Sequence, residues 1–306
     1  MLAPSRQSRV SVIIPLFNHA KYIEKAIESV ISQGDVVREL IVIDDGSKDD
    51  SLKIARDLGR SSEKIRVLSQ PNQGAHATIN RGIEESSGDL IAILNSDDFY
   101  LNGRLDTLVD FIDANPHVSL VGSKVRFVDQ FGTEQANDWY LTGLAEHDRL
   151  NYEPAAFLNA NIFVTTSNFL VRRRVFEEIG KFSSLRYAHD LEFLMRLLAR
   201  GRHVLIHEKS LVAYRFHATN TIKENHSAVR AELALIGAFF LQLSARNLTQ
   251  LNWHDIDLFQ GILKKHALSD AVFICLVHFL SNPIDSLEKN PFDCNEKLRG
   301  AVASVI

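Results

Sequence analysis

The sequence predicts an α/β fold with an open, mostly parallel sheet covered by helices, followed by a helical C-terminal region. Two observations predict the sheet. Short β-branched runs alternate with segments of helical period over the first 130 residues, and polar residues directly follow three of those runs. From about residue 225 onwards the apolar residues recur only at helical spacing, which predicts the appended helices.

The composition is that of an ordinary folded protein. The chain has 306 residues, of which 45% are hydrophobic and 24% charged, and its formal net charge is −4. These values exclude disorder and fibrous repeats, and the charge gives no reason to expect a nucleic-acid partner. The two cysteines, Cys275 and Cys294, form no CxxC pair and suit a reducing cytosol.

The first half of the chain predicts four strands, each followed by a helix. β-Branched residues concentrate in the strands, as in a parallel sheet that is buried on both faces. The expected strands span residues 10–15, 39–44, 65–69 and 90–95, and the expected helices span 22–31, 50–58, 75–86 and 103–114.

After residue 118 the pattern changes to shorter elements. We expect strands at 120–123, 125–128, 166–171, 204–206 and 211–215, an irregular segment at 137–160, and helices at 173–179, 190–199, 233–243, 256–262 and 270–280. This pattern predicts a flexible N-terminus over residues 1–8, an α/β domain over 9–222 and a helical region over 223–306.

Acidic side chains follow two of the predicted strands. If the strand order is 3-2-1-4, the ends carrying Asp44, Asp45, Asp97 and Asp98 converge at one edge of the sheet, where ligands bind in open α/β folds. Four close carboxylates repel one another unless a cation lies among them, and hard divalent cations prefer oxygen ligands. The pattern therefore predicts a Mg²⁺ or Mn²⁺ site that holds a diphosphate, although residues 44–47 alone would also suit a turn before a helix.

Several other classes of protein lack support in the sequence. The first strand is not followed by GxGxxG, and GxxxxGK[ST] does not occur, which argues against a dinucleotide-binding or P-loop domain. We see no secretory signal, and the apolar stretch 271–280 is far shorter than the roughly 20 residues of a spanning helix. We therefore expect a cytoplasmic protein. Any association with a membrane would be peripheral and at the inner face of the cell membrane.

Six motifs occur in a characteristic order, and together they carry a resemblance to one enzyme family. They are Ser11–Asn18, Tyr22–Gln33, Leu40–Ser47, Asn72–Gly74 with Ile79–Gly82, Gly88–Asp98 and Ala188–Glu192. With them the chain resembles a family 2 glycosyltransferase over about residues 9–220. The resemblance implies the GT-A fold, whose sheet is Rossmann-like, and an inverting sugar transfer.

The resemblance implies that the first two strand ends and the loop before the third helix hold the nucleotide. Phe17 would lie against the base and Asp45 would accept a hydrogen bond from its ring N–H, although Phe17 also suits a core position and His76 a solvent-facing one. The nucleotide-binding residues implied in this way are Pro15, Phe17, Asn18, Asp44, Asp45, Gln73, Gly74, His76, Asn95 and Ser96.

The metal motif of the family falls on Asn95-Ser96-Asp97, with asparagine at the first acidic position. Asp97 matches the usual direct ligand of Mn²⁺ or Mg²⁺, so the departure at Asn95 bears on metal affinity rather than on fold. Asp98 would either support the metal site or cap the next helix. The resemblance also implies His217 as a metal ligand and Arg215 as a phosphate contact, with a structural role as the alternative for each.

Asp190 matches the catalytic base of the family. An inverting transfer needs one carboxylate that takes the proton of the acceptor hydroxyl while its oxygen attacks C1. An N-cap is the other role that aspartate favours at the start of a helix.

The resemblance therefore implies a transferase that moves a sugar, hexosyl or N-acetylhexosaminyl, from a nucleoside diphosphate, with UDP favoured. The acceptor would be a hydroxyl of a glycan, a lipid-linked glycan or a glycoprotein. A non-catalytic GT-A-like module that binds nucleotide or glycan is the main alternative, and a nucleotidyltransferase is a weaker one. The helices of 223–306 would pack on the domain, on a membrane surface or on a second subunit.

Overall fold

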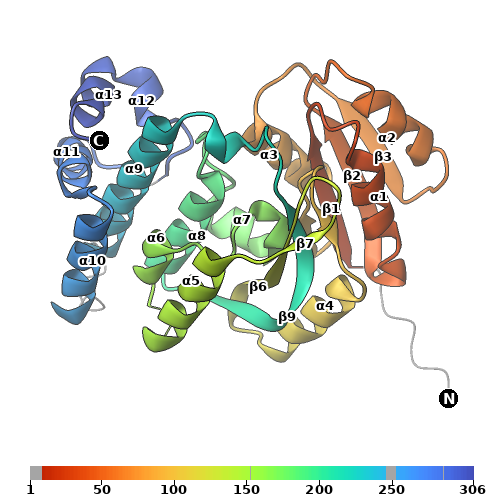
Figure 1. Ribbon diagram of the computed structural model, residues 1–306, viewed down its shortest axis with the longest axis horizontal. Helices are drawn as coiled ribbons and strands as arrows, with labels where there is room; N and C mark the ends of the chain where they lie inside the picture. Colours follow the sequence, from red (N-terminus) through yellow and green to blue (C-terminus); the bar gives the residue numbers. More distant parts are fainter. Residues whose placement is uncertain (1–8, 152, 246–252, 285) are drawn as a thin grey trace. The chain divides into compact units, whose positions relative to one another are not determined.

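A computed structural model describes residues 9–151, 153–245, 253–284 and 286–306, and the predicted flexible N-terminus at 1–8 lies outside the described residues (Figure 1). The chain forms two compact units. The first comprises residues 1–136, 163–180 and 203–216, and the second comprises 137–162, 181–202 and 217–306. Each unit draws on separate stretches of sequence, while the domain limits 9–222 and 223–306 remain a prediction.

The first unit contains one mixed sheet whose parallel half has the expected order. Strands β3, β2, β1 and β4 lie side by side in that order and all run in the same direction. This confirms the 3-2-1-4 arrangement and brings the carboxyl ends of β1, β2 and β4 to one edge. The strands are β1 (Val10–Leu16), β2 (Val37–Asp44), β3 (Ile65–Ser69) and β4 (Leu90–Ile93).

The other half of the sheet differs from the expectation. The predicted strand pair at 120–123 and 125–128 is one strand, β6 (Val118–Val128), and the pair at 204–206 and 211–215 is one strand, β9 (His203–Arg215). Irregular register near Ser123 and Lys124 allows both strands to continue. The predicted strand at 166–171 begins as a 3-10 turn, η2 (Thr166–Asn168), because the Thr165 hydroxyl accepts a hydrogen bond from the backbone N–H of Ser167.

Only the short strand β8 (Leu170–Arg172) remains of that prediction, and it joins β4 to β6 antiparallel to both. Strand β9 lies parallel to β6. Two further short strands complete the sheet, β5 (Phe99–Tyr100) beside β9 and β7 (Glu134–Gln135) beside β6.

Helices cover the sheet of the first unit (Figure 1). They are α1 (Ile23–Ile31), η1 (Gly34–Val36), α2 (Ser51–Gly59), α3 (Ala75–Glu85), α4 (Arg104–Ala114) and α7 (Arg173–Ile179). Helix α3 packs directly on β1, because Gly82 has no side chain and the Ile13 side chain fills that space. This close approach fixes the helix that follows the nucleotide-binding loop predicted at residues 73–76.

The second unit is helical. It contains α5 (Asp138–Arg149), α6 (Ala156–Asn159), α8 (His189–Ala199), η3 (Thr221–Lys223), α9 (His226–Ala245), α10 (Trp253–Lys265), α11 (Ser269–Ser281), α12 (Pro291–Cys294) and α13 (Glu296–Ala303). The prediction that residues 137–160 are irregular was wrong. Asn137 caps α5 by accepting the backbone N–H of Tyr140, a start signal that the weak apolar period of this segment hides.

Helix α9 is longer than the apolar stretch 271–280 that stood out in the sequence. The helix has 20 residues and, by length and composition, could span a membrane. Its most apolar 18-residue window has a mean hydropathy of 1.4, but 67% of that window is buried. It packs against α8, α11 and α13. This burial fits a core helix of the second unit.

Replacing Gly82 by alanine should destabilise the protein. The added methyl group would overlap the Ile13 side chain and force α3 away from β1, at a cost of about 1–3 kcal/mol. Thermal unfolding followed by circular dichroism measures the effect. Gly261→Ala in α10 is the matched control, because nothing lies within 4 Å of its added Cβ. That variant should unfold at or above the wild-type temperature, and the packing argument fails if Gly82→Ala does the same.

Candidate functional site

The carboxyl end of β2 carries two buried aspartates that shape the loops around them. Asp44 accepts hydrogen bonds from the backbone N–H groups of Gly46 and Ser47, both at 3.2 Å, so it closes the turn after the strand. Asp45 is 3% exposed and reaches the loop before α3. Residues 44–47 therefore do form a turn, as the alternative prediction for this segment had it, and Asp44 closes that turn.

Asp45 joins the end of β2 to the loop before α3. Its carboxylate accepts the backbone N–H groups of Gln73 at 2.9 Å and Gly74 at 2.8 Å, and the side-chain amide of Gln70 at 2.9 Å. Gly74 has φ +89°, a conformation that favours glycine. The ring of half-buried His76 lies within 3.4 Å of the position that a Cβ atom on Gly74 would take. The structure thus brings Asp45, Gln73, Gly74 and His76 together.

The end of β1 meets the same loops. Asn18 donates its backbone N–H to the Ser47 hydroxyl at 3.0 Å and accepts the backbone N–H of Lys48 on its side chain at 2.7 Å. Phe17, just before it, is 43% exposed and therefore is not the core aromatic that the sequence left open. Pro15 lies buried inside β1 opposite Ile43.

Asn95, at the end of β4, is engaged by its neighbours. Its side-chain amide donates to the Thr165 hydroxyl at 2.9 Å, and its side-chain oxygen accepts the Thr166 hydroxyl at 3.0 Å. Its backbone N–H donates to the Ser167 hydroxyl at 2.9 Å. An asparagine can both donate and accept here, whereas an ionised aspartate could only accept, so these contacts give a physical reason for the departure from the acidic pattern.

Asp98 and Arg215 support the loop that carries Asp97 through hydrogen bonds. Buried Asp98 accepts the Ser167 hydroxyl at 2.6 Å and the backbone N–H of Arg215 at 2.9 Å. Burial, followed by the charge of Asp97, raises the pKa of the Asp98 carboxyl well above its usual range. The Arg215 guanidinium donates to the Asp97 carbonyl at 2.8 Å and lies over the ring of Tyr22.

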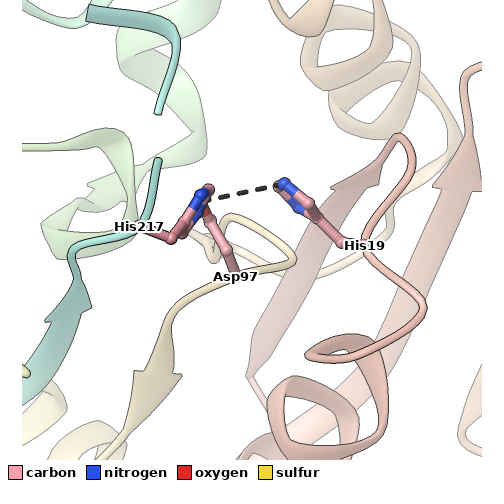
Figure 2. A group of neighbouring side chains, drawn as sticks. All are labelled: His19, Asp97 and His217. Carbon is pink, nitrogen blue, oxygen red and sulfur yellow. Dashed lines mark ion pairs between the residues drawn. The ribbon is translucent and has the colours of Figure 1, made fainter. Parts of the chain in front are cut away.

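His19 and Asp97 face each other across the ends of β1 and β4, as Figure 2 shows. His19 Nε2 lies 4.0 Å from Asp97 Oδ2, and both side chains are partly buried. His19 Nδ1 shares a hydrogen bond with the Ser96 hydroxyl at 2.8 Å, which orients the ring. The sequence analysis missed His19, although its place four residues after Pro15, beyond the first strand, was the available signal.

His217 belongs to the second unit and is its first residue after β9. It follows Arg215 by two positions, and two residues of extended chain span about 7 Å. Its ring Nδ1 shares a hydrogen bond with the Thr219 hydroxyl at 2.9 Å, and its backbone N–H donates to the Asn220 side chain at 2.7 Å. The imidazole is therefore held by its own turn.

Asp190 is the second residue of α8 in the second unit. The N-cap of this helix is Ala188, so the capping role that the sequence left open for Asp190 is not the one it has. Its carboxylate accepts the side-chain amide of Asn161 at 3.2 Å. Burial raises the pKa of Asp190 to about 6, while hydrogen bonds from Asn161 and the helix backbone oppose the rise.

Comparison with known proteins gives relatives that are glycosyltransferases. The chain is 26% identical over 212 residues to "Glycosyltransferase GlyG" of Streptococcus pneumoniae, covering 67% of this chain and 70% of that protein. It is 36% identical over 103 residues to the "GalNAc(5)-diNAcBac-PP-undecaprenol beta-1,3-glucosyltransferase" of Campylobacter jejuni, a match that covers 33% of each chain.

Among solved structures, TarS of S. aureus shares the fold. The structure of its residues 1–349 with UDP-GlcNAc matches with a TM-score of 0.57 at 18% identity, covering 97% of this chain and 88% of that one. Another TarS structure is covered over only 54% of its length. This likeness confirms the GT-A fold expected from the sequence.

Residues 11–180, more than half of the chain, match the profile of the family described as "Glycosyl transferase family 2". The match spans the ends of β1, β2 and β4, where the nucleotide and metal residues were predicted. The chain therefore belongs to glycosyl transferase family 2.

Proposed function

We propose that this glycosyltransferase moves a sugar from a nucleoside diphosphate, with UDP favoured, to a hydroxyl of a glycan acceptor with inversion at C1. The observation that carries the proposal is the convergence of three strand ends in the first unit. At this edge, Asp45 after β2 holds the loop before α3 by hydrogen bonds. Asp97, which follows β4, faces His19, which follows β1. A nucleoside and its diphosphate need two such adjoining places.

The nucleoside would lie along the ends of β1 and β2. Exposed Phe17 would stack on the base, and the loop held by Asp45 would line its edge. The Asp45 carboxylate already accepts three N–H groups, so any contact with the base would use its remaining lone pairs. The residues proposed to line the nucleotide are Pro15, Phe17, Asn18, Asp44, Asp45, Gln73, Gly74, His76, Asn95 and Ser96.

We propose that Asp97 and His19 of the first unit hold a divalent cation, Mn²⁺ or Mg²⁺ (Figure 2), with His217 as a further ligand that the family resemblance implies. The 4.0 Å between His19 Nε2 and Asp97 Oδ2 suits two ligands of one ion, each about 2.1 Å from it. His217 is the third candidate because it follows β9 so closely. Two imidazoles beside one carboxylate favour Mn²⁺ over Mg²⁺. A bound cation would neutralise the charge of the leaving diphosphate.

Asp190 is the proposed base. Its ionised carboxylate would accept the proton of the acceptor hydroxyl while that oxygen forms a bond to C1 of the sugar. The bond from C1 to the diphosphate oxygen breaks on the opposite face, so a donor with an α-linked D-sugar gives a β-linked product. Its pKa of about 6 leaves Asp190 ionised at neutral pH and more basic than an ordinary aspartate.

The donor and acceptor are proposed from the relatives. TarS has been solved with UDP-GlcNAc, and the Campylobacter jejuni relative is named for a glucosyl transfer to an undecaprenol-linked glycan. We propose a hexosyl or N-acetylhexosaminyl donor and a glycan, lipid-linked glycan or glycoprotein acceptor. Work on a lipid-linked acceptor would place the enzyme at the cytoplasmic face of a membrane, with the C-terminal helices as the contact to that membrane or to a second subunit.

UDP should bind this protein, and more tightly with metal. Isothermal calorimetry with UDP, with and without Mn²⁺, should give a Kd at least about 10-fold lower with the metal, because the ion pairs with the diphosphate. Asp97→Ala should abolish the difference. If UDP does not bind in either condition, the UDP assignment is wrong and another nucleotide must be tested.

Replacing His19 should weaken the metal site without disturbing the fold. Mn²⁺ binding measured by electron paramagnetic resonance should weaken about 10- to 100-fold in His19→Ala, because one ligand is lost. Asp57→Asn, at an exposed carboxylate paired with Arg60, is the control and should bind Mn²⁺ as the wild type does. Equal Mn²⁺ affinity in His19→Ala and wild type would remove His19 from the ligand set.

The turnover rate should rise with pH through about 6, because Asp190 must lose its proton to act as a base. UDP release at saturating substrate across pH 4.5–8 measures this limb. Asp190→Asn should lose turnover, by about 10²-fold or more, and keep UDP binding. A variant that keeps turnover would exclude Asp190 as the base, whereas a wild type that binds UDP and transfers no sugar would favour the non-catalytic module.

Asp190 should also lower stability at neutral pH, which gives a check without turnover. Its pKa rises from about 3.9 unfolded to about 6 folded, so its contribution to the free energy of unfolding falls as pH rises through that window. Asp190→Asn should therefore be more stable than the wild type at pH 7, and the gain should vanish at pH 4. Urea unfolding at both pH values measures it, and equal differences at the two pH values would contradict the raised pKa.

A further inference from the structure

Glu232, in the middle of α9, reaches the segment that leads into α8. Its Oε1 accepts the backbone N–H of Arg186 at 2.8 Å, and its Oε2 accepts those of Tyr187 and Ala188, both at 2.9 Å. The side chain is 4% exposed. In the described part of the chain no lysine or arginine side chain pairs with it, so three consecutive backbone N–H groups are its partners.

These three residues end where α8 begins. Ala188 is the N-cap of the helix, and Asp190 is the second helical residue. A segment whose three N–H groups all point to one buried carboxylate has little freedom left, because moving it would break these hydrogen bonds, and at buried Ala188 the loss would leave a buried polar group unsatisfied. The position of Glu232 therefore sets the start of α8 and with it the backbone of Asp190.

Burying the carboxylate of Glu232 costs free energy, which suggests that the segment it holds needs this particular side chain. A buried carboxylate loses its hydration, and a neutral glutamine or an ordinary helix cap would satisfy a loop at lower cost. Burial raises the pKa of Glu232, which reports that cost. The carboxylate also brings a second negative charge near Asp190.

We propose that Glu232 is a positioning residue for Asp190: it fixes residues 186–188, and so the carboxylate of the base, from the C-terminal helical region. The inference rests on the proposed role of Asp190 and extends it to a residue far along the chain. It also gives α9 a role in the transfer reaction beyond packing. A purely structural cap would hold the helix and leave the titration of Asp190 unchanged.

The charged groups around this pair are few. Asp293 of α12 lies near Glu232, and the Arg186 side chain pairs with Glu224 beside η3 at 2.6 Å. Further along α8, Glu192 forms a buried ion pair with Arg196 at 2.8 Å, so that its charge is balanced within its own helix. The charge of Glu232, on another element, raises the pKa of Asp190, so its removal should lower that pKa.

The test uses the full chain and compares Glu232→Gln with Glu224→Gln. Both remove a carboxylate that contacts Arg186, but Glu224 contacts only its side chain at the surface. Glu232→Gln should lower kcat roughly 10-fold at pH 8 and shift the acid limb of the kcat profile downward by about half a pH unit. The KM for the donor should stay at its wild-type value, since donor binding belongs to the first unit. Glu224→Gln should match the wild type in all three.

Hydrogen exchange gives a readout that needs no turnover. The amides of residues 186–188 should exchange faster in Glu232→Gln and at the wild-type rate in Glu224→Gln. If Glu232→Gln does not fold, Glu232→Asp keeps the charge but shortens the reach. It should lower kcat without moving the pH limb.

Two failures are distinguishable. Wild-type kcat, pH limb and amide exchange in Glu232→Gln, with an inactive Asp190→Asn, would overturn the positioning role alone. Wild-type turnover in Asp190→Asn would instead overturn the proposed base and the inference that rests on it.

Discussion

The organisation of the sheet edge in the first unit depends on a buried carboxylate that accepts backbone N–H groups. Asp45 lies at the end of β2, and three N–H groups from the following loop region point to it. Without it, the loop before α3 would have to satisfy those donors elsewhere, and the N–H of Gly74, which has a positive φ, would lose its partner. One acidic side chain thus places an entire loop at the sheet edge.

The same physical device recurs in the second unit, where Glu232 accepts three consecutive N–H groups before α8. The two carboxylates act on different segments, one before α3 and one before the helix that carries Asp190. Both are oriented by backbone, which lacks the rotamer freedom of side chains, so both define their loops more sharply than a surface ion pair would. Acidic side chains here therefore have structural roles, besides the cation binding that is proposed for Asp97.

The sequence could predict what local pattern encodes. Alternating periods predicted an open parallel sheet, and the structure has the strand order 3-2-1-4 on which the expected convergence of the ends of β1, β2 and β4 depended. The sequence could not show His19 opposite Asp97, because that pairing arises from two strand ends 78 positions apart, nor Glu232 beneath residues 186–188. Nor did it reveal α5, whose start signal is the single cap Asn137.

Each of the two units contains an aspartate whose pKa is raised by burial, Asp98 in the first unit and Asp190 in the second. In the first unit, burial and then the charge of Asp97 raise the pKa of Asp98, which lies at the acidic edge proposed to hold the diphosphate. In the second unit, burial raises the pKa of Asp190 to about 6, which would leave this carboxylate ionised at neutral pH and basic enough for the role proposed for it. Burial therefore raises the pKa of an aspartate in each unit, but the partners differ: Asp98 accepts the Ser167 hydroxyl and the backbone N–H of Arg215, whereas Asp190 accepts the Asn161 amide. The same effect of burial would therefore serve two purposes. Asp98 has two hydrogen-bond donors that it holds in place, whereas Asp190 is the residue proposed to accept the proton of the acceptor hydroxyl.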